Sequence, residues 1–170
     1  MSEHISIYVA DLAAYNAGHL HGVWIDATQD LNDIQAQVDM MLAASPVEGA
    51  VEYAIHDYEG FDGYSLGEYE GLENAHNAAC FIEEYPEFGG ALLAHFNDID
   101  KARKAAEEDY CGFYASLADY AQNLIEETSS IPQHLANYIN YTAMARDMEY
   151  SGDVFTLETG FEQVHVFWNR

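Results

Sequence analysis

Two short runs, Ile5-Ser6-Ile7-Tyr8-Val9 and Gly22-Val23-Trp24-Ile25, decide the start of the fold. β-Branched and aromatic residues dominate both runs, and the turn-forming stretch Tyr15-Asn16-Ala17-Gly18 separates them. This pattern predicts a pair of β-strands.

A helix and a third strand are predicted next. Asp30 can cap a helix over residues 31–42, in which apolar residues recur every three or four positions. Residues 51–55 alternate in the manner of a half-buried strand. Residues 1–61 are therefore predicted to form a β-rich N-terminal unit with one helix.

The middle of the chain, residues 62–105, carries helical signals. An apolar stripe runs along residues 72–82, and a second helix is expected to start near Asp98. Pro86 and Gly89-Gly90 are expected to separate these segments. On the second helix we expect ion pairs between residues four positions apart, such as Arg103 with Glu107.

Residues 106–170 show mixed signals. An amphipathic helix is predicted over residues 116–127. A further helix is predicted to begin around residue 130, to carry an apolar stripe through Thr142, and to end before Ser151-Gly152. The runs at residues 154–157 and 164–168 predict a β-hairpin that turns around Gly160. Taken together, the three units predict an α+β fold with a mixed C-terminal unit.

The charge composition is unusual for a folded chain. The 170 residues include 30 Asp and Glu but only five Lys and Arg, which gives a formal net charge of −25 at pH 7 with His neutral. Hydrophobic residues make up 49% of the chain, which is enough to form a core. Such a protein should repel nucleic acids and anionic membranes, so its expected partner is a strongly positive surface.

The acidic residues are dispersed along the chain. Their longest run is Glu107-Glu108-Asp109, and the others are single or paired. A charge of −25 corresponds to roughly 40 Å of duplex DNA, which carries one charge per ~1.7 Å of axis. The pattern therefore indicates an extended negative surface on a folded scaffold. Adaptation to high salt is an alternative explanation of the same composition.

Several other protein classes agree poorly with the sequence. Cys80 and Cys111 are the only cysteines, too few for a disulfide framework or a Cys-rich zinc site. The first residues lack the basic and apolar regions of a signal peptide, and no run of about 18 apolar residues is present. We therefore expect a cytoplasmic protein that does not enter a membrane.

Few residues are candidates for catalysis or metal binding. His19 and His21 could lie on one face of a strand, but no third ligand follows at a recognisable spacing. Cys111 could act as a nucleophile, although its acidic neighbours would raise the pKa of its thiol. We expect no cofactor and no enzymatic activity. A metal-dependent hydrolase that uses His19, His21 and nearby acids is an alternative.

Four segments carry a resemblance to a known family. They are YVADLAAYNAG at residues 8–18 followed by Gly22-Val23-Trp24, AIHDYEGF at residues 54–61, EDYCGFY at residues 108–114, and most of residues 117–147. Their order and spacing resemble those of the ArdA antirestriction proteins over nearly the whole chain. Residues 62–105 differ most from the family pattern.

This resemblance implies both a function and a shape. ArdA proteins are carried by mobile genetic elements, and they are elongated, three-domain homodimers that imitate bent B-form DNA. They occupy the DNA-binding cleft of type I restriction–modification enzymes, so that incoming DNA escapes. From the resemblance we expect an elongated chain of three small units that acts in a bacterial cytoplasm on the methyltransferase core of such an enzyme. We also expect a homodimer that forms through residues 106–170.

Two surfaces are predicted from the resemblance and the charge pattern. The acidic DNA-mimic surface is expected to comprise Asp57, Glu59, Glu73, Glu84, Glu107, Glu108, Asp109, Asp119, Glu126 and Glu127. The dimer interface is expected to comprise Tyr138, Ile139, Tyr141, Val166 and Trp168. Carboxylates in the positions of phosphates would let a cleft built for DNA bind a protein instead. A mimic of DNA directed at a topoisomerase or a nucleoid protein is the alternative.

Overall fold

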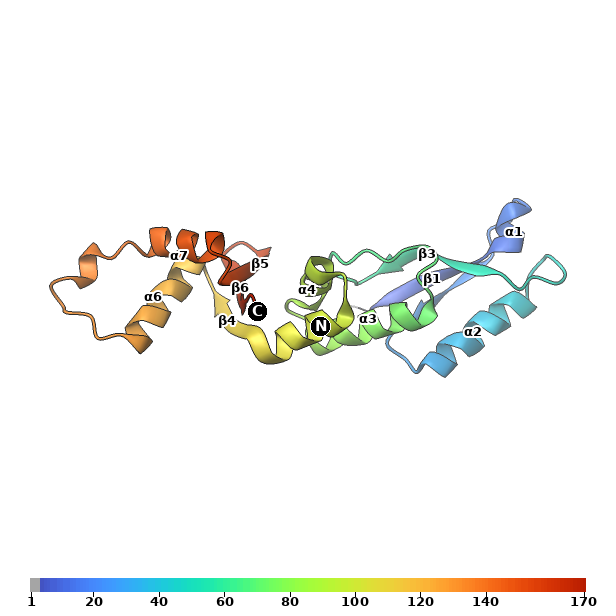
Figure 1. Cartoon of the computed structure of the whole chain (residues 1–170). Coiled ribbons are helices and arrows are strands. Elements are labelled where there is room, and N and C mark those ends of the chain that lie inside the picture. Colours follow the sequence, from blue (N-terminus) through green and yellow to red (C-terminus); the bar gives the residue numbers. More distant parts are fainter. Residues whose placement is uncertain (1–3) are drawn as a thin grey trace. The chain divides into compact units, whose positions relative to one another are not determined.

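The computed structural model describes residues 4–170 as an α+β protein with two small antiparallel sheets (Figure 1). The predicted α+β class is confirmed. Contacts within the chain divide it into two compact units, Met1–Ile99 and Asp100–Arg170, which we call unit 1 and unit 2. The finer division into three units stays a prediction.

Unit 1 is built on a three-stranded sheet with the order β2-β1-β3. Its strands are β1 (Ser6–Asp11), β2 (Gly22–Asp26) and β3 (Tyr53–Glu59). The short helix α1 (Leu12–Asn16) follows β1, and α2 (Leu31–Ala43) connects β2 to β3. Asp30 caps α2 as predicted, because its carboxylate accepts a hydrogen bond from the N–H of Asn32 at 2.9 Å.

One face of this sheet forms the core against α2. The buried residues are Ile7 and Val9 on β1, Ile25 on β2, and Ile34 and Val38 on α2, each at most 1% exposed. Side chains alternate along a strand, so the residues between them lie on the opposite face. Helix α2 therefore covers only one face of the sheet.

Strand β3 starts later and runs further than the pattern at residues 51–55 predicts. It pairs with β1 through Asp57 and Glu59, which lie opposite Tyr8 and Ser6. Main-chain pairing with β1 holds these exposed polar residues in the strand, and hydrophobic alternation alone does not reveal this.

Two further helices complete unit 1, α3 (Leu72–Glu84) and α4 (Gly89–Phe96). Gly89 and Gly90 form the first turn of α4, whereas the sequence predicts a break there. A Cβ atom on Gly90 would lie 2.6 Å from the carbonyl oxygen of Phe61. Glycine is therefore needed because two backbone segments approach closely, and not because the chain must turn.

Unit 2 contains the second sheet, with the strand order β4-β6-β5. Helix α5 (Ile99–Lys104) begins at the last residue of unit 1 and continues into a π-helical turn, η1 (Ala105–Asp109). The other elements are β4 (Tyr110–Tyr114), α6 (Leu117–Thr128), the 3₁₀ turn η2 (Ala136–Tyr138), α7 (Tyr141–Tyr150), β5 (Val154–Gly160) and β6 (Gln163–Trp168). The predicted hairpin and the predicted helix at residues 116–127 are confirmed. The Arg103–Glu107 pair is also present, at 3.9 Å.

The core of unit 2 lies between this sheet and the helices α6 and α7. Tyr120 and Ala121 on α6 and Ala145 on α7 are buried against Val154 and Val166 of the hairpin. Unit 2 thus has its own hydrophobic core.

In unit 2 one strand is not predicted from the sequence, and one predicted helix begins later than expected. Strand β4 was not predicted, because Gly112 interrupts its aromatic run with a positive φ of 128° and a shift in register. The predicted helix does not begin around residue 130, because residues 130–140 form a mostly exposed loop with one 3₁₀ turn. That segment has little core to pack against, and short helices in proteins depend on packing. Helix α7 begins only after Asn140, whose side chain accepts a hydrogen bond from the N–H of Ala143 at 3.0 Å.

Within residues 4–170, no helix is both long enough and apolar enough to cross a membrane.

Candidate acidic interaction surface

Nearly all of the described carboxylates lie on the surface. Of the 29 Asp and Glu side chains in residues 4–170, 26 are exposed, and the other three are Asp11, Glu70 and Asp109. Asp11 is buried because it caps α1, its carboxylate accepting a hydrogen bond from the N–H of Ala14 at 3.1 Å. The folded chain therefore presents its negative charge to solvent and keeps little of it inside.

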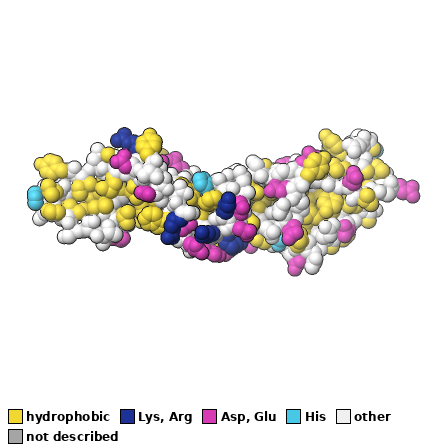
Figure 2. Space-filling model, in the orientation of Figure 1, with side chains coloured by type: hydrophobic (Ala, Val, Ile, Leu, Met, Phe, Trp, Pro, Cys, Tyr) yellow, Lys and Arg dark blue, Asp and Glu magenta, His cyan; other side chains and the backbone are white. Residues whose placement is uncertain are grey.

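The positive charges are confined to unit 2. Unit 1 has 18 Asp and Glu and no Lys or Arg, which gives a formal charge of −18. Unit 2 has 12 Asp and Glu against five Lys and Arg, which gives −7. Figure 2 shows acidic side chains scattered over the visible face of unit 1, with no Lys or Arg among them. Among the side-chain types of unit 1, His alone can carry a positive charge, so the electrostatic field of the unit is predominantly negative.

Nine of the ten carboxylates predicted for the acidic surface are exposed. In unit 1, Asp57 and Glu59 lie on β3, and Glu73 and Glu84 lie near the two ends of α3. In unit 2 the exposed members are Glu107 and Glu108 on η1 and Asp119, Glu126 and Glu127 on α6. Helices and a strand therefore fix the backbone positions of these nine carboxylates.

Asp109 must be removed from the predicted acidic surface. Its carboxylate is 7% exposed and pairs with the guanidinium of Arg170 at 2.9 Å. Arg170 also donates a hydrogen bond to the carbonyl oxygen of Glu108 at 3.2 Å, so it fastens the end of the chain to η1. The role of Asp109 is therefore structural, and a partner cannot reach its charge.

This ion pair predicts a stability effect. Arg170→Gln should lower the free energy of unfolding of unit 2 by about 1–3 kcal/mol, because it leaves the buried Asp109 carboxylate without its charged partner. Arg103→Gln removes an equal charge from an exposed pair and should cost less than about 0.5 kcal/mol. Urea unfolding followed by circular dichroism measures both. Equal effects would show that burial of Asp109 does not matter.

The face of the unit 1 sheet away from α2 carries both carboxylates and aromatic rings. Tyr8 of β1 lies between Trp24 of β2 and Asp57 of β3 in the strand register. The rings of Tyr8 and Trp24 have centroids 5.4 Å apart, at an angle of 47°. Trp24 is 44% exposed. Neither ring is among the site residues predicted from the sequence, although the alternation in residues 5–9 and 22–25 places both rings opposite the core.

One carboxylate on this face is held in its charged form. The hydroxyl and the N–H of Thr28 donate hydrogen bonds to Asp26 at 2.6 and 2.9 Å, and they hold the pKa of Asp26 below its ordinary value. Asp26 and Glu59 flank Ser6 in the next row of the register.

The candidates for metal binding and nucleophilic catalysis are not assembled into a site. Within residues 4–170, no three His, Cys, Asp or Glu side chains come together as metal ligands would. His21 lies with Nε2 2.7 Å from the carbonyl oxygen of Met41, and His19 is exposed. Burial raises the pKa of the Cys111 thiol, which lowers the fraction of reactive thiolate.

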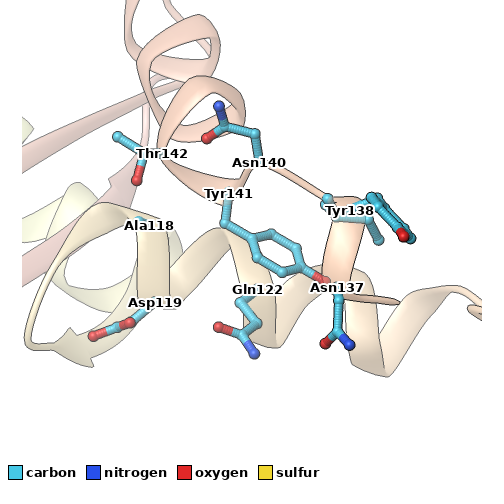
Figure 3. A pocket seen from close by; sticks show the side chains of 9 residues that line it. Ala118, Asp119, Gln122, Asn137, Tyr138, Asn140, Tyr141 and Thr142 are labelled. Atoms are coloured by element: carbon cyan, nitrogen blue, oxygen red, sulfur yellow. The ribbon is translucent and has the colours of Figure 1, made fainter. Parts of the chain in front are cut away.

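The residues predicted for the dimer interface have different environments. Tyr138 is 84% exposed, whereas Val166 is fully buried in the core of unit 2 and has no side-chain surface to offer. Tyr141 and Trp168 pack partly against that core. Tyr138, Ile139 and Tyr141 line an open hollow of about 520 Å³ beside α6 (Figure 3). Its wall also includes Asp119 and Gln122, so an acidic residue and apolar residues share one surface.

Together, the fold and the charge define a class of protein: a small α+β chain whose exposed ionised groups are overwhelmingly carboxylates. The family model described as "Antirestriction protein (ArdA)" matches residues 7–163, which is nearly the whole chain. The chain therefore belongs to the ArdA antirestriction family, and the resemblance seen in the sequence is confirmed. No curated protein sequence matches the chain.

Proposed function

We propose that this protein inhibits type I restriction–modification enzymes by imitating DNA in their DNA-binding cleft. The observation that carries the proposal is the exposure of 26 of the 29 described carboxylates together with the absence of Lys and Arg from unit 1. Membership of an antirestriction family supports the choice of target. A cleft that binds DNA through its phosphates is lined by Arg and Lys, and these side chains can pair with carboxylates instead.

In this mechanism occupancy of the cleft is sufficient, and no bond is made or broken. Exposed carboxylates on β3, α3, η1 and α6 would take the places of phosphates. Counterions are released when the two charged surfaces meet, and long-range attraction speeds the encounter. The protein would therefore compete with DNA and leave the catalytic groups of the enzyme unchanged.

Competition with DNA tests this proposal directly. The protein is titrated into a purified type I methyltransferase core bound to a fluorescent duplex, at several salt concentrations between about 50 and 200 mM. We expect the duplex to be displaced, and the affinity of the protein for the enzyme to fall steeply as salt rises. A stable ternary complex that retains the duplex in the cleft would contradict the proposal.

We propose further that the protein forms a homodimer through unit 2. Large apolar side chains are exposed there, with Phe161 at 89% and Tyr138 at 84%, and such exposure is typical of association surfaces. Light scattering at micromolar concentration should give twice the mass of the 19.0 kDa chain. Tyr138→Asp should shift the protein toward the monomer. The control Tyr69→Asp alters a 77% exposed tyrosine of unit 1 and should leave the dimer intact. A monomeric parent protein would contradict this proposal.

A further inference from the structure

The open face of the unit 1 sheet combines two kinds of binding group in a small area. One row of the register is Trp24, Tyr8 and Asp57, and the adjacent row is Asp26, Ser6 and Glu59. Neighbouring strands lie about 4.8 Å apart, and a two-residue step along a strand covers about 6.7 Å. The register therefore places three exposed carboxylates, Asp57, Asp26 and Glu59, in the same row as the aromatic pair or in the adjacent row.

The geometry of the aromatic pair depends on a glycine. A Cβ atom on Gly22 would lie 2.7 Å from both Cζ and the hydroxyl oxygen of Tyr8 and 2.6 Å from the carbonyl oxygen of Val9. Because Gly22 has no side chain, the Tyr8 ring can lie across its backbone. Trp24 packs against Tyr8 from the same strand, β2, and stays 44% exposed. The backbone at Gly22 thus supports the Tyr8 ring on the sheet side, and Trp24 remains accessible to a partner on the solvent side.

The chemistry of this face selects one kind of side chain. An aromatic face attracts cations, and carboxylates beside it add charge-assisted hydrogen bonds. Arginine satisfies both at once, because its planar guanidinium stacks on a ring while its edge donates to a carboxylate. The ammonium of lysine is compact and not planar, so it cannot stack on a ring while it donates hydrogen bonds from a flat edge to a carboxylate. Unit 1 contains no Lys or Arg that could occupy this face in place of a partner's side chain.

We propose that the Tyr8–Trp24 face is an anchor site for an arginine side chain of the partner protein, with Asp57, Asp26 and Glu59 around the guanidinium. The arginine would belong to the DNA-binding cleft of the restriction–modification enzyme, so the identity of the partner rests on the proposed function. The anchor adds an element that plain charge imitation lacks: it distinguishes an arginine from a lysine at one position of the partner.

Two peptides test the arginine preference without any restriction enzyme. A Trp168→Phe background leaves Trp24 as the only tryptophan, so its fluorescence reports on this face alone. Hexaarginine should reach half of its effect on the Trp24 emission at a concentration at least about fivefold lower than hexalysine. Tyr8→Leu in this background should reduce the preference to less than about twofold, because it removes one of the two rings.

Matched variants exclude indirect effects. Tyr8→Phe keeps the ring and should keep the preference for arginine. Tyr69→Leu removes a 77% exposed tyrosine elsewhere in unit 1 and should also keep it. Circular dichroism confirms that each variant folds. Equal half-saturation by the two peptides, or a preference that survives Tyr8→Leu, would overturn the inference.

A second arm uses the purified methyltransferase core. Trp24→Leu should raise the concentration needed for half inhibition by about 5- to 30-fold at fixed salt, with no change in the slope of log affinity against log salt, because the ring carries no net charge. Asp57→Asn should lower that slope by about one. If the parent protein does not inhibit the enzyme, the proposed function fails while the peptide arm still tests the anchor. If the parent inhibits and Trp24→Leu inhibits equally well, only the anchor fails.

Discussion

Ala121→Asp should abolish inhibition of the restriction enzyme, although it makes the chain more negative. Ala121 is fully buried on α6 against the hairpin and α7. An unpaired carboxylate there should lower the free energy of unfolding of unit 2 by about 3 kcal/mol or more, because it is taken out of water without a partner. The unit would lose the shape that presents Asp119, Glu126 and Glu127. Circular dichroism measures the loss of stability, and titration against restriction activity measures the loss of inhibition.

The neighbouring residue supplies the control. Gln122→Asp adds the same charge at an exposed position of the same helix and should leave both stability and inhibition nearly unchanged. The comparison separates charge from shape. If Ala121→Asp inhibits as well as the parent, any sufficiently acidic chain is effective and the folded scaffold is not required.

Removing four carboxylates from unit 1 should have the second large effect. The variant combines Asp57→Asn, Glu59→Gln, Glu73→Gln and Glu84→Gln, all at exposed positions of β3 and α3. Each exposed ion pair contributes about 0.2–1 kcal/mol, so the concentration for half inhibition should rise by about 10- to 100-fold at low salt. The slope of log affinity against log salt should also become shallower by up to about four.

A second quadruple variant changes the net charge equally. It carries Asp147→Asn, Glu149→Gln, Asp153→Asn and Glu158→Gln, exposed residues of unit 2 outside the proposed acidic surface. We expect its half-inhibition concentration to rise by less than about threefold. Equal losses in the two variants would mean that total charge governs inhibition and that the positions of the carboxylates do not.

Much of the local structure was predictable because short-range patterns carry it. The strands near residues 5–9 and 22–25, the cap at Asp30, the helix at residues 116–127 and the hairpin follow from alternation, capping and helical spacing. The errors fall where distant residues decide. The segment from residue 130 to residue 140 has a helical pattern but little core beneath it, so it stays a loop.

The candidate surface shows the same division. Exposure of most predicted carboxylates was foreseeable, because an unpaired charge is rarely buried. Asp109 is the exception, and its partner Arg170 lies 61 positions further along the chain. Likewise, the run at residues 164–168 was predictable as a strand, but its residues from Val164 to Phe167 are all buried, so only the packing of α6 and α7 shows that Val166 faces the core of unit 2.

The sequence by itself determined the composition that carries the function: 30 carboxylates, five cations, enough apolar residues for folded units, and the family pattern. These properties are sums or short-range patterns, and they do not depend on how the chain folds. Only the tertiary structure decided which carboxylates reach solvent, that Asp109 is paired inside, and that Tyr8 meets Trp24 and Asp57 on one open face. Strand register and helix packing bring these residues together, and both are set by contacts between segments far apart in the sequence.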